Sequence, residues 1–116
     1  MHVRELDELL GTSARLAIMA TVMDGQRWTF SDLGRETGLA DGNLHVQTGK
    51  LTGARYLARE KAPRGNRTVT SFEVTEKGRR VFLEFLRRLN EAADPRSAGP
   101  VEKLRPRRMG DGSQVW

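Results

Sequence analysis

The chain has 116 residues, which is enough for one domain with a modest core. It contains no cysteine, and this excludes a disulfide framework, a thiolate metal site and a thiol redox switch. The N-terminus lacks the pattern of a signal peptide, and no apolar run approaches the roughly 20 residues of a membrane span, so we expect a cytoplasmic protein. The net charge of +5 is concentrated in residues 55–67, where Arg55, Arg59, Lys61, Arg64 and Arg67 stand against the single acid Glu60.

Two short helices are predicted at the start of the chain. The first ends near residue 10, and its apolar positions are Leu6, Leu9 and Leu10. The second covers residues 14–23 and is capped by Thr12 or Ser13, because their hydroxyls can accept from free backbone N–H groups. Its apolar positions at helical spacing are Leu16, Met19, Ala20 and Met23. Asp24-Gly25 then gives a strong turn signal.

A very short strand and a short helix follow. Residues 28–30 are predicted to form the strand. Ser31 is expected to cap a helix over residues 32–37, with Leu33 inward and Gly38 as its C-terminal stop. The two aromatic residues of the strand segment belong either to the core or to a pocket for a small-molecule effector, and the sequence leaves this choice open.

Residues 41–54 are the most informative segment, because they predict a helix with one docking face and one exposed face. Asp41 is expected to cap this helix, and Leu44, Thr48 and Leu51 fall on one side at about 100° per residue. The opposite side carries small or polar groups, as a helix that enters a major groove requires. The residues expected there are Gly42, Asn43, His45, Val46, Gly49 and Lys50, with Gln47 on the border.

The side chains of this exposed face match the groups on base edges. Asn43 can pair bidentately with adenine, and so can Gln47 if it turns toward the groove. Lys50 can reach guanine acceptors or a phosphate, His45 can donate to either, and Val46 can touch a thymine methyl. The alternative is that Asn43 and His45 are ordinary solvated helix residues.

A basic hairpin is predicted next. Residues 56–62 and 68–74 are β-prone and flank a turn cluster at 63–67. Its cations can enter a minor groove or clamp the flanking phosphates, or they can simply keep the hairpin solvated and discourage edge pairing. The residues expected to contact DNA from this hairpin, taken as 59–68, are Arg59, Lys61, Arg64, Asn66 and Arg67.

The last predicted element is a helix capped by Thr75, with a broad apolar stripe. Its apolar area exceeds what one small core needs, and this favours a homodimer, although the same residues could complete a single core. The expected interface residues are Leu6, Leu9, Leu10, Phe82, Phe85, Leu86 and Leu89. After a domain of residues 1–93, proline, glycine and charge without periodicity predict a flexible tail over residues 94–116.

This order of elements is that of a winged helix-turn-helix, a mainly α fold with a small β-hairpin, and we expect it to dimerise through its terminal helices. Over about residues 5–92 the chain resembles small prokaryotic winged-helix transcriptional regulators of the MarR/ArsR-like kind. The segments that carry the resemblance are Ser13-Ala14-Arg15-Leu16-Ala17-Ile18-Met19, Thr29-Phe30-Ser31-Asp32-Leu33, Gly38-Leu39-Ala40-Asp41-Gly42-Asn43-Leu44, Lys50-Leu51, Tyr56-Leu57 and Val74-Thr75-Glu76-Lys77-Gly78-Arg79. The resemblance implies a homodimer that places two recognition helices in successive major grooves of a palindromic operator, usually as a repressor.

Two positions depart from that family pattern. Arg55 stands where such proteins usually have glycine, so either the helix ends earlier, at Gly53, or Arg55 accepts a strained φ. Gly49 occupies a recognition-helix position where a larger residue is common, and it costs about 1 kcal/mol relative to alanine. Close approach to DNA would explain this glycine, and so would a locally unstable helix that becomes ordered on binding.

Other function classes find less support. The chain has no nucleophile elbow, metal-ligand spacing, P-loop or dinucleotide fingerprint, so we expect no enzyme, no bound metal and no cofactor. RNA binding lacks the surface aromatic pairs that stack bases. The principal alternative is a winged-helix protein–protein interaction module in a larger assembly.

Overall fold

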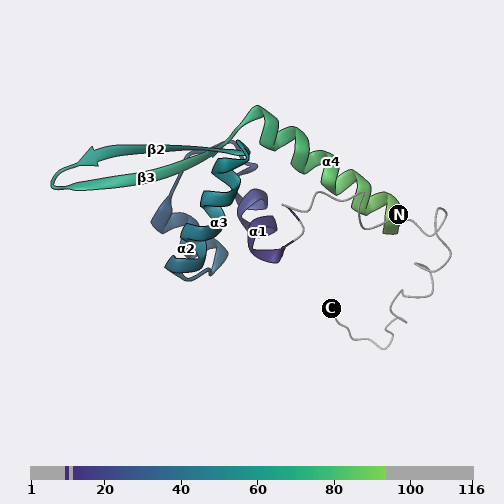
Figure 1. Cartoon of the computed structure of the whole chain (residues 1–116), viewed down its shortest axis with the longest axis horizontal. Coiled ribbons are helices and arrows are strands. Elements are labelled where there is room, and N and C mark those ends of the chain that lie inside the picture. Colours follow the sequence, from purple (N-terminus) through teal and green to yellow (C-terminus); the bar gives the residue numbers. More distant parts are fainter. Residues whose placement is uncertain (1–9, 11, 94–116) are drawn as a thin grey trace.

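The computed structural model describes residue 10 and residues 12–93 (Figure 1). The predicted interface residues Leu6 and Leu9 and the predicted tail 94–116 lie outside these residues. Four helices and a three-stranded antiparallel sheet of order β1-β3-β2 make up the described fold. The elements are α1 (Ser13–Val22), β1 (Trp28–Thr29), α2 (Phe30–Thr37), α3 (Asp41–Gly53), β2 (Leu57–Arg64), β3 (Arg67–Val74) and α4 (Glu76–Ala93).

Helices α1, α2 and α3 form the body of the molecule. The β2–β3 hairpin, here called the wing, and α4 extend from it in opposite directions (Figure 1). One apolar core joins the body to the bases of the wing and α4, and its members are Leu10, Ile18, Met19, Val22, Leu33, Leu44, Leu51, Tyr56, Leu57, Phe72, Phe82 and Phe85. None of the helices within the described ranges has the length and apolar character needed to cross a membrane.

The buried face of α1 differs from the predicted one. The residues turned to the core are Arg15, Ile18, Met19 and Val22, whereas Ala20 is exposed and Leu16 and Met23 are half-buried. The face is therefore shifted by one residue, or about 100°. Because α1 is apolar on nearly all sides, its sequence fits both faces, and packing decides between them.

The helix caps follow side-chain chemistry, with two corrections. Thr12 caps α1 as predicted, by accepting from the backbone N–H of Arg15. Thr29, and not Ser31, caps α2, because its hydroxyl accepts from the backbone N–H of Asp32 at 3.1 Å. Helix α2 consequently begins at Phe30. Asp41 is the first residue of α3 and not its cap, since the cap position is Ala40, which makes no side-chain bond.

The earlier helix end and the strained φ, given above as alternatives for Arg55, both occur at the end of α3. The helix ends at Gly53, and Arg55 has φ 68° in the left-handed region. The backbone N–H of Tyr56 donates to the carbonyl of Leu51, and that of Arg55 donates to the carbonyl of Thr52, each at 2.9 Å. This pair of bonds is a Schellman motif, which normally favours glycine at the left-handed position.

The wing is longer and its turn tighter than predicted. Its strands reach Arg64 and Arg67, so the turn has two residues, Gly65-Asn66, in place of the predicted cluster 63–67. Gly65 has φ 63°, which suits the first central position of a type II′ hairpin turn. Pro63 lies in β2, an edge strand, where a missing N–H is tolerated.

The start of α4 is tied to the end of α3. The Thr75 hydroxyl accepts from the backbone N–H of Gly78 at 2.9 Å, which confirms Thr75 as the cap, and it donates to the carbonyl of Arg55 at 2.6 Å. The predicted interface residues Leu10, Phe82 and Phe85 prove to be buried core residues of the single chain. The exposed apolar residues of α4 are Leu83 at 52%, Leu86 at 41% and Leu89 at 37%.

Candidate nucleic-acid interface

Helix α3 docks by one face, as its sequence predicts. Leu44, Thr48 and Leu51 are buried, and the Thr48 hydroxyl donates to the carbonyl of Leu44 at 2.8 Å. The opposite ridge carries little side chain, because it consists of Gly42, Val46, Gly49 and Gly53. A Cβ added at any of the three glycines would meet no atom within 4 Å. The exposed ridge is therefore low, and a partner can approach the helix backbone closely.

Polar groups flank this ridge. Asn43, His45 and Lys50 are exposed, as expected of residues that contact bases. Gln47 differs, because it is half-buried and both ends of its amide are engaged. Its Oε1 accepts from Nη1 of Arg15 at 2.6 Å, and its Nε2 donates to Oδ1 of Asn43 at 2.9 Å. Gln47 is thus turned along the protein surface and not outward.

Arg15 is the residue that the sequence analysis missed. It lies on the core face of α1 with only 8% of its surface exposed. A buried guanidinium needs hydrogen-bond acceptors, because an unsatisfied buried charge costs several kcal/mol. An arginine inside an apolar helix was the available signal, but its partner is 32 residues away along the chain.

The wing places Arg59 and Lys61 on one face and its acids, Glu60 and Glu73, on the other. Arg59 pairs with Phe72 and Lys61 with Thr70, so the two cations share the face that carries the buried Phe72. Glu60 points to the opposite face. There its Oε1 accepts from Nη1 of Arg27 at 2.9 Å, and Arg27 also lies 3.6 Å from Glu73. The face shared by Arg59 and Lys61 is left positively charged.

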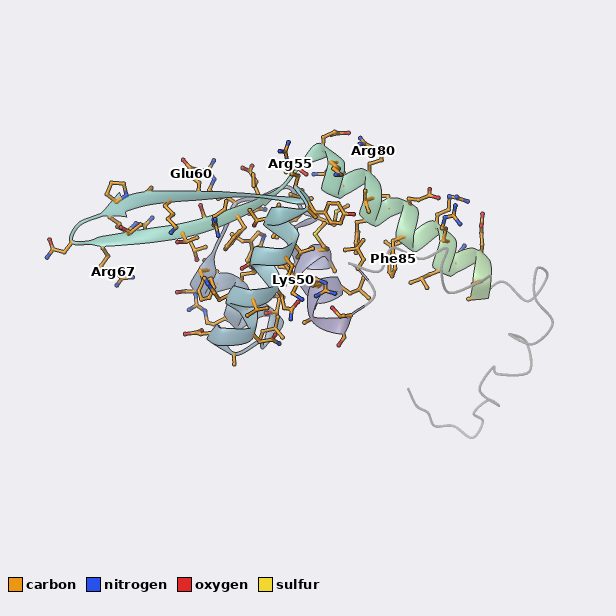
Figure 2. All side chains as sticks on the ribbon, viewed as in Figure 1. Lys50, Arg55, Glu60, Arg67, Arg80 and Phe85 are labelled. Carbon is orange, nitrogen blue, oxygen red and sulfur yellow. The ribbon has the colours of Figure 1, made fainter. Side chains whose placement is uncertain are left out.

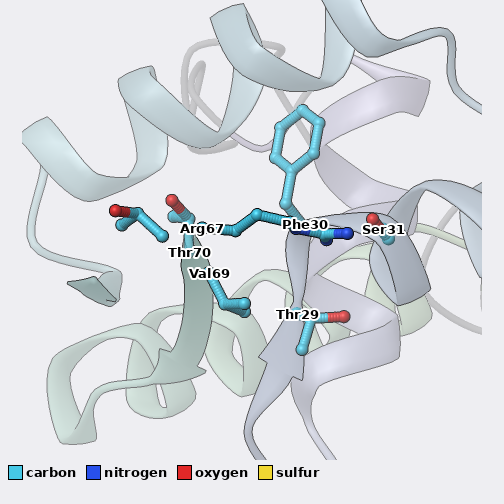
Figure 3. A pocket seen from close by; sticks show the side chains of 7 residues that line it. Thr29, Phe30, Ser31, Arg67, Val69 and Thr70 are labelled. Carbon is cyan, nitrogen blue, oxygen red and sulfur yellow. The ribbon is translucent and has the colours of Figure 1, made fainter. Parts of the chain in front are cut away.

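Arg67 lies beside the start of α2 (Figure 3). Its side chain reaches from β3 toward Phe30 and Ser31, and these residues share a cleft of about 200 Å³. The cleft is lined by Thr29, Phe30, Ser31, Arg67, Thr68, Val69 and Thr70. A guanidinium, several hydroxyls and the positive end of a helix dipole form an environment that suits phosphate oxygens.

Apart from Gln47, the predicted contact residues thus occupy two exposed surfaces. Figure 2 shows Lys50 on α3 and Arg67 on the wing, with α2 between them in this view. Arg59, Lys61, Arg64, Asn66 and Arg67 are all exposed. No group of three or more histidine, aspartate or glutamate side chains within the described ranges is arranged to hold a metal ion.

Comparison with known proteins agrees with this geometry. The winged helix DNA-binding domain family matches residues 14–92. No curated protein matches the chain in sequence.

Solved structures share the fold. A transcriptional regulator homologue from Pyrococcus horikoshii OT3 is 24% identical with a TM-score of 0.74, over 83% of this chain and 97% of its own. A protein from Porphyromonas gingivalis W83, assigned to the MarR family of transcriptional regulators, is 15% identical with a TM-score of 0.63, over 79% and 89%. The PcaV transcriptional regulator from Streptomyces coelicolor, solved with its natural ligand, is 17% identical with a TM-score of 0.63, over 88% and 73%.

Proposed function

This chain belongs to the winged helix DNA-binding domain family, and from that premise we propose that it is a sequence-specific transcriptional regulator acting as a homodimeric repressor. The observation that carries the proposal is the low, exposed ridge of α3 flanked by Asn43 and Lys50, beside a wing with a cationic face. Residues 41–54 are proposed to read the major groove, and residues 59–68 of the wing to contact the minor groove or the backbone.

Phosphate contacts are proposed to supply most of the affinity. Arg67 and the first turn of α2 line one cleft, so one backbone phosphate can contact both elements. Lys50 and Arg64 add exposed cations on α3 and the wing. Such contacts release counterions from DNA, and binding should therefore weaken steeply as salt rises.

The proposed dimer uses the part of α4 that leaves the body. Leu83, Leu86 and Leu89 are exposed there, which supports a contact with a second copy. Replacing both Leu86 and Leu89 by lysine should convert a dimer into a monomer in analytical ultracentrifugation, while Leu83→Lys tests whether the contact extends around the helix. A monomeric wild-type protein would contradict the dimer. We extend the proposal to a small-molecule effector because the PcaV transcriptional regulator was solved with its natural ligand.

Selection of duplexes from a random pool tests the function directly. We expect an enriched palindromic sequence with half-sites about 34–36 Å apart, the spacing of one helical turn. Elution of the pure protein with random duplex DNA at low salt provides the second measurement. The absence of any shift, together with no enriched sequence, would favour the alternative function, a winged-helix protein–protein interaction module.

A further inference from the structure

Three side chains form a polar relay from the core to the exposed face of α3. The buried Arg15 donates from Nη1 to Oε1 of Gln47 at 2.6 Å. Gln47 donates from Nε2 to Oδ1 of Asn43 at 2.9 Å. We call these three residues the Arg15 relay. It joins α1 to the residue of α3 whose side chain stands at the flank of the low ridge.

The buried end of the relay fixes its direction. A guanidinium has only donors, so the atom of Gln47 that faces Arg15 must be the amide oxygen. The amide nitrogen of Gln47 then faces Asn43, and the Asn43 atom that accepts from it must be oxygen. Rotating either amide by half a turn would bring two donors or two acceptors together and break a hydrogen bond.

The outer end of the relay is therefore a donor. The Oδ1 atom of Asn43 is turned toward Gln47, and its Nδ2 group is the end left for a partner. A free asparagine pairs with adenine because it presents an acceptor and a donor together. Guanine instead shows two adjacent acceptors, O6 and N7, in the major groove. An asparagine whose oxygen is held by the protein matches guanine better than adenine.

We propose that Arg15 is a positioning residue that presents Asn43 to the major groove with its donor end outward, so that this position selects guanine. The inference rests on the proposed function, since it names the base edge that the same surface reads. It also replaces the adenine contact expected for Asn43 from its residue type alone.

Gln47→Glu should reverse the outer end of the relay. One carboxylate oxygen keeps the bond to Arg15 as a charge-assisted pair, and the other can only accept. Asn43 must then turn Nδ2 inward and Oδ1 outward. Duplex selection with this variant should replace guanine by cytosine or adenine, whose exocyclic amino groups donate, with about a tenfold change in preference at one position of each half-site.

Two control variants separate this effect from charge and from folding. Gln47→Met removes both relay bonds without adding charge and should leave that position degenerate. Gln26→Glu adds the same charge at an exposed turn outside α3 and should keep the wild-type consensus. Thermal unfolding of each variant confirms that it is folded. The same consensus from wild type and Gln47→Glu, or changes spread over several positions, would overturn the inference.

Hydrogen exchange of the side-chain amides tests the relay without DNA. In the wild type one Gln47 amide proton should exchange several-fold more slowly than either proton of Asn43, because only that proton is bonded within the relay. In Gln47→Glu one of the Asn43 amide protons should become the slow one. Fast exchange at Gln47 would overturn the relay, whereas a protected relay in a protein that enriches no duplex would instead overturn the proposed function.

Discussion

Arg55 and Gly78 show how single residues fix the junction between α3, the wing and α4. Arg55 occupies the left-handed position of the Schellman motif, where a Cβ is unfavourable. Gly78 lies against the backbone of Tyr56, the residue that follows Arg55. The carbonyl of Tyr56 accepts from the N–H of Thr75 at 3.1 Å. The end of α3 and the start of α4 are thus held in direct contact.

Arg55→Gly should be more stable than Arg55→Ala by about 1 kcal/mol, because glycine adopts the positive φ without steric cost. Urea unfolding of the two variants measures the difference and removes the effect of losing the arginine side chain. Ala54→Gly provides the control, since Ala54 has φ −83° and glycine there should lower stability. Equal midpoints for Arg55→Gly and Arg55→Ala would contradict the strain.

Gly78→Ala should destabilise the fold by about 2–3 kcal/mol. The added Cβ would lie 2.9 Å from the carbonyl carbon of Tyr56 and closer still to its oxygen, and this backbone cannot move without breaking the bonds from Thr75. Thermal or urea unfolding measures the loss. A neutral result would show that α4 can shift away from the wing.

At the level of whole elements, α3 combines a well-packed inner face with an outer ridge of poor helix formers. Gly49, in the interior of α3, lowers helix stability by about 1 kcal/mol relative to alanine, and Gly42 and Gly53 lie at the two ends of the same ridge. Nothing in the packing requires them, because their Cβ positions are open. A function outside the fold, such as close approach of DNA, is the remaining physical reason for the low ridge.

Gly49→Ala should therefore stabilise the protein by about 1 kcal/mol and at the same time weaken DNA binding. The free energy of unfolding and the dissociation constant for the selected duplex are both measured. If the glycine instead served to keep the helix weak until DNA binds, the alanine would pre-form the helix and tighten binding. The sign of the change in affinity decides between the two explanations.

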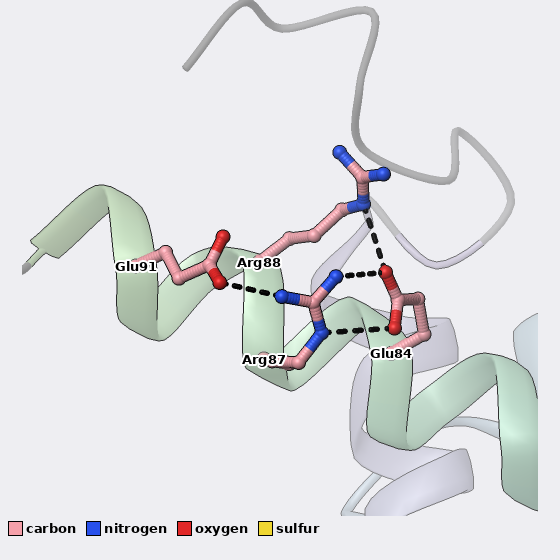
Figure 4. A network of polar contacts seen from close by, with 4 residues as sticks. All are labelled: Glu84, Arg87, Arg88 and Glu91. Atoms are coloured by element: carbon pink, nitrogen blue, oxygen red, sulfur yellow. Dashed lines mark hydrogen bonds and ion pairs between the residues drawn. The ribbon is translucent and has the colours of Figure 1, made fainter.

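Helix α4 carries an ion-pair network on its exposed side (Figure 4). Arg87 bridges Glu84 and Glu91, and Arg88 donates from Nε to Glu84 at 3.1 Å. The hydrogen bond from Arg87, with a smaller contribution from Arg88, lowers the pKa of Glu84 below its usual 4.5. The same pairing raises the pKa of Arg87.

Glu84 should consequently stabilise α4 only while it is ionised. Because its pKa is lower in the folded state, its contribution is present above about pH 4.5 and is lost as the pH falls through the folded-state pKa. Glu84→Gln should lower the urea midpoint slightly at neutral pH and leave it unchanged near pH 3, since exposed pairs contribute little. In an Arg87→Met background the substitution should have a much weaker pH dependence.

At the scale of the whole molecule, charge is distributed between the wing and α4. Arg67 lies on the wing beside α2, whereas Arg80 lies on α4, which extends the other way (Figure 2). Both are exposed arginines of the same charge. They form a matched pair for deciding whether DNA binding depends on the position of a cation or only on net charge.

Arg67→Ala should reduce the slope of log affinity against log salt by about 1, because one phosphate contact is lost. Arg80→Ala should leave the slope unchanged. Fluorescence anisotropy with a labelled duplex, between about 50 and 200 mM salt, measures both slopes. The Arg67 variant should weaken binding to unrelated duplexes as much as to the selected one, and equal slopes for the two variants would contradict a contact from the wing.

The order of elements was predictable because its signals are local. The docking face of α3, the left-handed Gly38 and the Thr75 cap are each encoded within a few neighbouring residues, and the structure confirms them. The prediction that Ser31 caps α2 was wrong. Thr29 and Ser31 are both good caps, and the pairing of β1 with β3 places Thr29 at the start of the helix.

The sequence by itself determined the winged helix fold and the concentration of positive charge in the wing, since periodicity, turn residues and charge are properties of short segments. Only the tertiary structure decided that Arg15 holds Gln47, that Phe82 and Phe85 are core residues, and which leucines of α4 remain exposed. These outcomes depend on contacts between residues far apart in the chain. Helix α1 is apolar on nearly all sides and α4 has a broad apolar stripe, so packing selects which part of each helix is buried.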